Sequence, residues 1–150
     1  MSPSPVVAEL APVCLAGPSP SVTVSMPTGW AERLDDQGKS ETWTFDDPEP
    51  RSAATVVVAR YLDVRWGFSV SGQPQPQNFV PSFGVLSRRV IDPYRLRYVQ
   101  TAPSPGYRTF GLIVDVVAGA VPEATVTVSV TVPSSQAALA TRLLDSLTVA

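Results

Sequence analysis

The feature that most constrains this fold is the alternation of apolar and polar side chains near the end of the chain. Residues 109–117 and 125–132 both alternate, the second as Thr-Val-Thr-Val-Ser-Val-Thr-Val. A period of two is what a β-strand with one buried face requires. Only a short connection with Gly119 and Pro122 separates the two segments, and so short a connection joins antiparallel neighbours. The sequence therefore predicts a long hairpin as the scaffold of the fold.

The segment that follows, residues 134–147, has the period of an amphipathic helix. Apolar residues fall on one arc and polar or small ones opposite, namely Leu139, Ala140, Leu143, Leu144 and Leu147 against Ala138, Thr141, Arg142 and Asp145. Ser134 and Ser135 are suited to cap the first amides of such a helix. We expect the helix to fold back and pack its apolar arc on the sheet.

Other segments have strand patterns between turn signals: residues 21–26, 41–45, 54–61, 85–91 and 94–101. The third is almost continuously apolar, which suits a central strand buried on both faces. In the last, Leu96 and Tyr98 fall on one face, and Arg95 and Arg97 fall on the other. The polar residues 31–40 predict a loop. Together the patterns predict an α+β fold, an antiparallel sheet of about seven strands with a C-terminal helix packed on it.

The length of 150 residues fits one domain, with enough core to need no disulfide or metal. Residues 1–20 contain five prolines and predict an N-terminal arm, and residues 21–150 predict the single domain. The net charge of −2 argues against nucleic acid as a dedicated partner.

Compartment is only weakly indicated. Cys14 is the only cysteine, so no internal disulfide can report an oxidising environment. The apolar run 6–16 has no preceding Lys or Arg, contains Pro12 and is too short to span a bilayer, so it does not match a signal peptide. We expect a chain without a membrane span, either cytoplasmic or the mature form of an exported protein.

The residues argue against an enzyme. With no His, a Ser-His-Asp hydrolase is excluded, and one Cys without His cannot supply a usual zinc site. Phosphate-binding glycine motifs are absent. Asp46, Asp47 and Glu49 could hold a hard cation, but carboxylates beside a proline more often form a solvated turn. We therefore expect a non-enzymatic protein with no cofactor and no metal.

A long aromatic loop is predicted at residues 62–81, where two prolines deny a continuous helix. Trp66, Phe68 and Phe79 either staple this loop to the sheet or, with Phe83, form a recognition surface. Trp30, just after a turn, has two similar interpretations, a lid on the core or a platform for stacking a ligand.

The arginines can be interpreted in two ways as well. Arg88, Arg89, Arg95, Arg97 and Arg108 lie on or beside neighbouring predicted strands. Outward-pointing arginines often serve only to keep the face of a sheet solvated. Their guanidinium groups can also bind the carboxylates of an acidic partner through two hydrogen bonds. The candidate binding residues are Trp66, Phe68, Phe79, Phe83, Arg95 and Arg97.

The order of these elements resembles a known family. A strand ending in Pro27-Thr28-Gly29-Trp30, a Tyr-Arg-Leu-Arg-Tyr strand, a long hairpin and a helix ending in Leu-Asp-Ser-Leu-Thr-Val are similar to the actinobacterial LpqN/LpqT lipoproteins. The resemblance implies a non-catalytic α/β/α sandwich, like PsbP and the Ran-binding protein Mog, that binds proteins or an apolar ligand, with cell-envelope association. Two features depart from the family pattern. No lipoprotein cleavage site precedes Cys14, and the long loop at residues 62–81, which is rich in Pro and Gln, stands where relatives commonly have a helix.

Three functions remain open on these grounds. The first is a protein-binding or accessory module of the LpqN-like class. The second is a chaperone-like carrier that holds an apolar segment of an exported protein or a lipid between the sheet and the long loop. The third is a structural accessory subunit of a larger complex.

Overall fold

Two antiparallel sheets and one α-helix form the described part of the chain. The computed structural model describes residues 9–15, 21–36, 40–47, 52–60, 84–118 and 121–149. Within these ranges the strands are β1 (Leu10–Leu15), β2 (Val22–Pro27), β3 (Ala31–Asp36), β4 (Ser40–Asp47), β5 (Ser52–Arg60), β6 (Val85–Asp92), β7 (Arg95–Thr101), β8 (Tyr107–Ala118), β9 (Val121–Pro133) and β10 (Thr148–Val149). A 3₁₀ turn, η2 (Ser134–Gln136), leads into the helix α1 (Ala137–Asp145).

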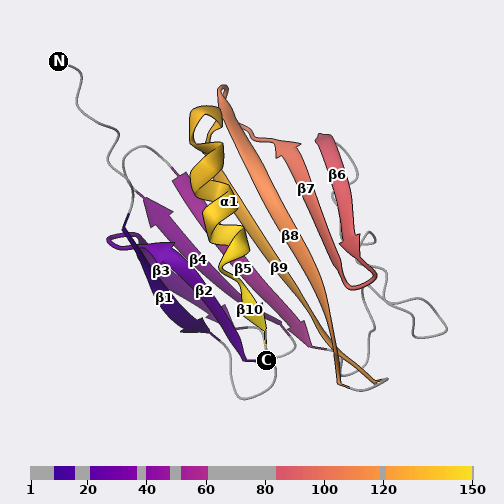
Figure 1. Ribbon diagram of the computed structural model, residues 1–150. Coiled ribbons are helices and arrows are strands. Elements are labelled where there is room, and N and C mark those ends of the chain that lie inside the picture. The colour runs from indigo at the N-terminus through magenta and orange to yellow at the C-terminus, as the bar shows by residue number, and fades with distance from the viewer. Residues whose placement is uncertain are drawn as a thin grey trace.

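The larger sheet has seven strands in the order β3-β4-β5-β9-β8-β7-β6, all antiparallel to their neighbours (Figure 1). Its two longest strands, β8 and β9, are the hairpin that the alternation predicts. The alternation also explains its inner face. Ala124, Val126, Val128, Val130 and Val132 are fully buried, whereas the Thr and Ser residues between Val126 and Val132 are half-exposed. The predicted antiparallel sheet with one C-terminal helix is confirmed.

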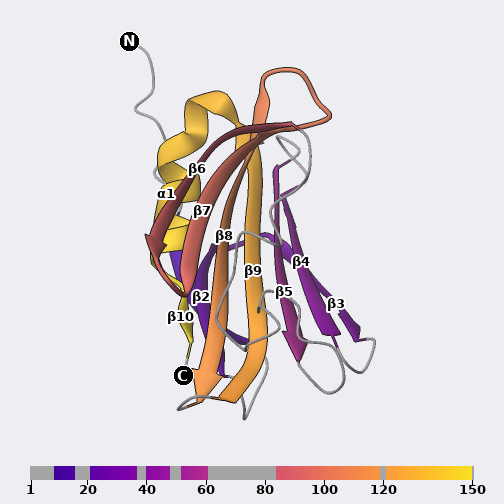
Figure 2. The same ribbon diagram turned by 90° about the vertical axis from the view of Figure 1, so that its right-hand side faces the viewer.

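A second layer covers the inner face of this sheet. It consists of α1 and the small sheet of order β1-β2-β10, which lie on the same side of the large sheet (Figure 2). The α1 residues Ala140, Leu143 and Leu144 and the β2 residues Val22 and Val24 join one continuous core with the inner faces of β4, β5, β8 and β9. The result is a sandwich-like α+β fold. Within the described ranges, no helix is both long and apolar enough to cross a membrane.

The polar segment 31–40, predicted as a loop, contains β3, so that prediction is wrong. β3 pairs with β4 over six residues, from Ala31 opposite Asp46 to Asp36 opposite Glu41. Its side chains from Ala31 to Asp35 are exposed. An edge strand that is exposed to solvent on both faces has no apolar face to bury. Its sequence therefore shows no alternation of apolar and polar residues.

The Pro-rich segment before residue 20 contains β1, which pairs with β2 from Leu10 opposite Pro27 to Leu15 opposite Val22. β1 is the outer strand of the small sheet, where a proline such as Pro12 is tolerated because one side of an edge strand needs no hydrogen-bond donor.

β5 is central, as predicted, but it is not buried on both faces. Val56 and Val58 are fully buried, while Thr55 and Val57 on the other face are half-exposed.

The helix is shorter than predicted, but its faces are as predicted. Ala140, Leu143 and Leu144 are buried, and Ala138, Thr141, Arg142 and Asp145 are exposed. Ser134 and Ser135 lie in η2, and neither η2 nor α1 has a side-chain hydrogen bond at its N-cap, so the predicted serine cap is wrong. The tight 3₁₀ turn replaces it. Leu147 lies beyond the end of α1 but still packs against the core.

Candidate binding groove

The register of the β6–β7 hairpin places three arginines on the same side of the sheet as α1. Arg97 lies opposite Leu112, and Arg95 lies opposite Val114. Both β8 residues belong to the core beneath α1, and directly opposed residues of neighbouring strands point to the same face. Arg89 of β6 lies opposite Arg97 and shares this face. The face that carries Arg95 and Arg97 is therefore the one that α1 and β10 cover in part, rather than a free outer face.

A groove of about 630 Å³ runs between this hairpin and the end of α1. Its lining is apolar at the base and cationic on the hairpin side, and consists of Arg89, Ile91, Arg95, Arg97, Leu112, Val114, Leu144, Asp145, Leu147, Thr148 and Val149. Among these residues are three arginines and one carboxylate. We refer to this feature as the arginine groove.

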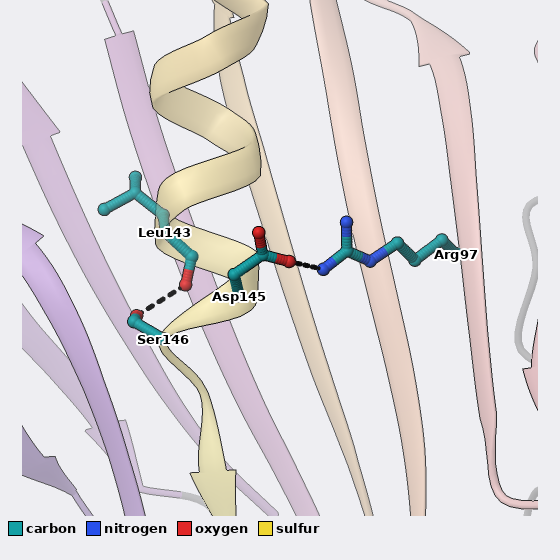
Figure 3. A network of polar contacts seen from close by, with 4 residues as sticks. All are labelled: Arg97, Leu143, Asp145 and Ser146. Atoms are coloured by element: carbon teal, nitrogen blue, oxygen red, sulfur yellow. Dashed lines mark hydrogen bonds and ion pairs between the residues drawn. The ribbon is translucent and has the colours of Figure 1, made fainter.

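One arginine of the groove is tied to the helix. Arg97 Nη2 donates to Oδ1 of Asp145, the last residue of α1 (Figure 3). A carboxylate is unfavourable at a helix C-terminus, where the backbone carbonyls already carry partial negative charge, and the guanidinium compensates for it. The Arg97 side chain is 24% exposed, and its Nε is buried without a hydrogen-bond partner among the described residues. Arg97 thus bridges the two walls of the groove.

The helix wall is fixed by Ser146. Its Oγ donates to the Leu143 carbonyl at 2.6 Å and accepts the Ser25 N–H at 2.8 Å (Figure 3 shows the first of these bonds). The first bond is the second that the Leu143 carbonyl accepts, because the Ser146 backbone N–H also donates to it at 3.2 Å. The bond from the Ser25 N–H fastens the same point to β2. The end of α1 is therefore held in place relative to the small sheet before any ligand binds.

The remaining two arginines are more open. Arg95 has a long contact of 3.9 Å with Asp92, and both side chains are substantially exposed. Such a pair contributes little to stability. Asp92 also accepts the Tyr94 N–H at 2.8 Å, which holds the carboxylate in the β6–β7 turn. Arg89 is exposed and lies directly opposite Arg97, and like charges in that position repel each other. An anion in the groove would relieve this repulsion.

The opposite face of the hairpin is a separate environment. Leu96, Tyr98 and Ile113 form a buried cluster there, distinct from the main core. Tyr98 lies over Gly111, its cross-strand partner, and burial raises the pKa of the Tyr98 phenol. The predicted division of Leu96 and Tyr98 from Arg95 and Arg97 is confirmed.

The structure brings together part of the arginine set. Arg89, Arg95 and Arg97 share the groove. Arg88 lies opposite Tyr98 and so belongs to the other face, and Arg108 lies at the far end of β8, opposite Thr101.

The aromatic candidates Trp66, Phe68, Phe79 and Phe83 lie outside the described residues. Trp30 is half-buried and packs against the main core, which favours the lid interpretation. The groove residues that sequence reasoning missed are mostly those of α1 and β10. The spacing of apolar residues in α1 is the same for a helix that only faces the core and for one that also lines a groove. No local signal in the sequence therefore distinguishes the groove wall from the core.

Metal chemistry has no support in the described part of the chain. No group of three or more His, Cys, Asp or Glu side chains in these ranges is placed to hold an ion. Asp46 and Asp47 lie at the end of β4, and Glu49 lies outside the described residues.

Comparison with known proteins adds no relative. Family models, curated proteins and solved structures were all searched, and none matches this chain. The chemistry of the arginine groove is therefore the basis on which a function can be proposed.

Proposed function

We propose that this protein is a non-catalytic protein-binding module of the LpqN-like class, with the PsbP-like fold that the resemblance implies, and that it binds its partner in the arginine groove. The observation that carries the proposal is the concentration of Arg89, Arg95 and Arg97 around an apolar base. A protein segment with carboxylates and apolar side chains is complementary to both parts of such a surface. Arginine is enriched at protein interfaces for this reason.

The electrostatics of the groove support an anionic partner. Three guanidinium groups face one carboxylate, and that carboxylate, of Asp145, is already engaged by Arg97. Arg89 and Arg95 are exposed enough to reorient toward a ligand. Each offers a planar fork that can bind a carboxylate through two hydrogen bonds.

The same lining supports recognition without catalysis. Its polar side chains are three arginines, Asp145 and Thr148, and none of these pairs a nucleophile with a base. The chain contains no His that could supply that base. Binding is the chemistry that these groups can perform.

A second candidate is a chaperone-like carrier of an apolar segment or a lipid. It is favoured by the base of the groove, where Leu112, Val114 and Leu144 lie beside Leu147 and Val149. A volume of about 630 Å³ is in the usual range of small-ligand pockets. The two candidates differ in what binding needs. A carrier depends on the apolar base, whereas an acidic protein partner depends on the arginines.

Site-specific photocrosslinking tests the proposal. A photoreactive phenylalanine analogue is placed at Ile91, which lines the groove and is 43% exposed, and the protein is irradiated in its native lysate. The matched control is the same analogue at Leu34 of β3, which is 51% exposed on the opposite edge of the sheet. We expect a discrete protein adduct from position 91 and none from position 34.

Charge reversal shows whether the adduct reflects the groove. Adding Arg89→Glu to the position-91 variant should abolish the adduct if an acidic protein binds, because it removes one of the three cations and adds a repelling charge. An adduct that survives this change, or equal adducts from positions 91 and 34, would contradict the proposal. A lipid adduct in place of a protein one would favour the carrier.

A further inference from the structure

β6 is the outermost strand of the seven-stranded sheet among the described residues. From Leu86 to Ile91 all of its side chains are exposed, including the large apolar Val90 at 63%. An outer strand presents one row of backbone N–H and C=O groups that its own sheet does not use. This row can accept another strand, and β6 also borders the arginine groove through Arg89 and Ile91.

Charge decides what kind of strand fits. Residues 85–101, the β6–β7 hairpin, carry four Arg and one Asp, a net charge of +3 in a chain whose net charge is −2. The rest of the chain therefore carries −5. The hairpin is thus a cationic edge on a chain whose net charge is negative. Opposite charges on neighbouring strands stabilise pairing, and like charges oppose it.

A second copy of this chain is a poor occupant of this edge. β6 pairs regularly with β7 only between irregularities near Leu86 and Ile91, which leaves residues 87–90 as the straight part of the edge. Arg88 and Arg89 are at the centre of that part. Antiparallel pairing of two β6 strands about a twofold axis would bring Arg88 of one copy close to Arg89 of the other. The irregularities and the arginines thus disfavour self-association.

We propose that β6 accepts an extended acidic segment of a partner protein as an eighth strand of the sheet. Successive side chains of the added strand point to opposite faces. An acidic residue beside Arg89 would enter the arginine groove, and its acidic neighbour would meet Arg88 on the other face. An apolar residue would follow beside Val90. The inference rests on the proposed function and specifies its partner, an extended segment with two adjacent carboxylates recognised through its backbone.

Backbone methylation tests the strand pairing. The probe is a fluorescein-labelled peptide of eight residues with a central Asp-Glu pair flanked by Val and Thr, and binding is followed by fluorescence anisotropy. Two further peptides carry N-methyl groups on the two alternate sets of amides. In an added strand only one set faces β6. We therefore expect one methylated peptide to bind about tenfold more weakly or worse, because it loses hydrogen bonds to the edge, and the other to bind like the parent.

Side-chain variants test the charge. Arg88→Glu and Arg89→Glu should each weaken binding of the parent peptide about tenfold or more, whereas Arg33→Glu on β3, at the opposite edge of the sheet, should leave it unchanged. A peptide with Lys in place of the Asp-Glu pair should not bind. Equal affinities for the two methylated peptides, or no saturable binding of the parent up to about 1 mM, would overturn strand addition.

The two proposals fail separately. A position-91 protein adduct that depends on Arg89, combined with equal affinities of the methylated peptides, would leave the binding function standing and refute strand addition. If position 91 gives no protein adduct either, the proposed function fails with it.

Discussion

The contact between Gly111 and Tyr98 gives the sharpest test of the packing. A β-carbon added at Gly111 would lie 2.1 Å from Cε1 and Cζ of the Tyr98 ring and 2.6 Å from its hydroxyl oxygen. Carbon atoms in contact sit about 3.5–4.0 Å apart, so in Gly111→Ala the ring would have to move by roughly 1.5 Å. Tyr98 is 6% exposed and packs with Leu96 and Ile113, so it cannot move without disturbing a buried cluster.

Two opposing effects set the size of the loss. Overpacking a filled site costs about 1–3 kcal/mol, and a clash with ring atoms rather than with a flexible chain end belongs at the upper limit. Replacing Gly by Ala inside a strand gains about 0.5–1 kcal/mol because the unfolded chain loses less entropy on folding. The clash is the larger effect. We expect Gly111→Ala to lower the free energy of unfolding by about 2 kcal/mol.

Urea unfolding followed by tryptophan fluorescence measures this loss, and a double-mutant cycle assigns it. Tyr98→Val removes the ring, so the alanine at position 111 should then cost little, with a coupling energy of about 1 kcal/mol or more. Gly106→Ala is the control, because Gly106 has a φ of +80° with nothing near its missing β-carbon. Its loss should add to that of Tyr98→Val. The packing argument would be refuted if Gly111→Ala left the free energy of unfolding unchanged. It would also be refuted if the loss from Gly111→Ala simply added to that from Tyr98→Val.

Two further predictions concern stability. Leu143→Ala should cost about 2–5 kcal/mol in the same assay because Leu143 is fully buried on the inner face of α1. Exposed Arg142→Ala should cost under about 0.5 kcal/mol, and equal losses would show that the helix face is misassigned. The second is alkaline destabilisation. Unfolded tyrosine ionises near pH 10, whereas burial raises the pKa of Tyr98 in the folded protein, so its contribution is complete below about pH 10 and is lost as the pH rises toward the folded pKa. Tyr98→Phe should reduce this loss, and a variant that loses as much stability above about pH 10 as the parent protein would contradict the assignment.

The sequence predicts the centre of the fold better than its edges. Alternation in residues 126–132 identifies both faces of β9, because here the valines pack in the main core while the residues between them are half-exposed. The arc of α1 is recoverable for the same reason. β3 could not be recognised because both of its faces are exposed to solvent. β1 is a strand only through its pairing with β2, whose residues lie later in the chain, from Val22 opposite Leu15 to Pro27 opposite Leu10.

The groove is harder to predict than the elements that form it. Alternation separates Arg95 and Arg97 from Leu96, but it cannot say that α1 lies on the arginine side. Nor can it place Arg89 with them, because the register of β6 shifts between Val85 and Ser87 and between Val90 and Asp92. Each shift interrupts the regular alternation, so the face on which a β6 residue lies cannot be deduced by counting along the strand. The distance between the end of α1 and β7 is a tertiary quantity that no local pattern encodes.

The aromatic segment 66–83 stays a prediction, and the groove now supplies an assay for it. If Trp66 and Phe79 form part of the recognition surface, Trp66→Ala and Phe79→Ala should abolish the protein adduct at position 91 while the melting temperature stays within a few degrees. If they staple the segment to the sheet, each substitution removes a large buried apolar area and should cost about 3–5 kcal/mol. Leu143→Ala is the control for stability alone, since Leu143 lies in the core and not in the groove lining. The amount of adduct is then compared between a Trp66 variant and a Leu143 variant of equal stability. If both lose the same amount, the aromatics act through folding, and the recognition hypothesis for this segment is wrong.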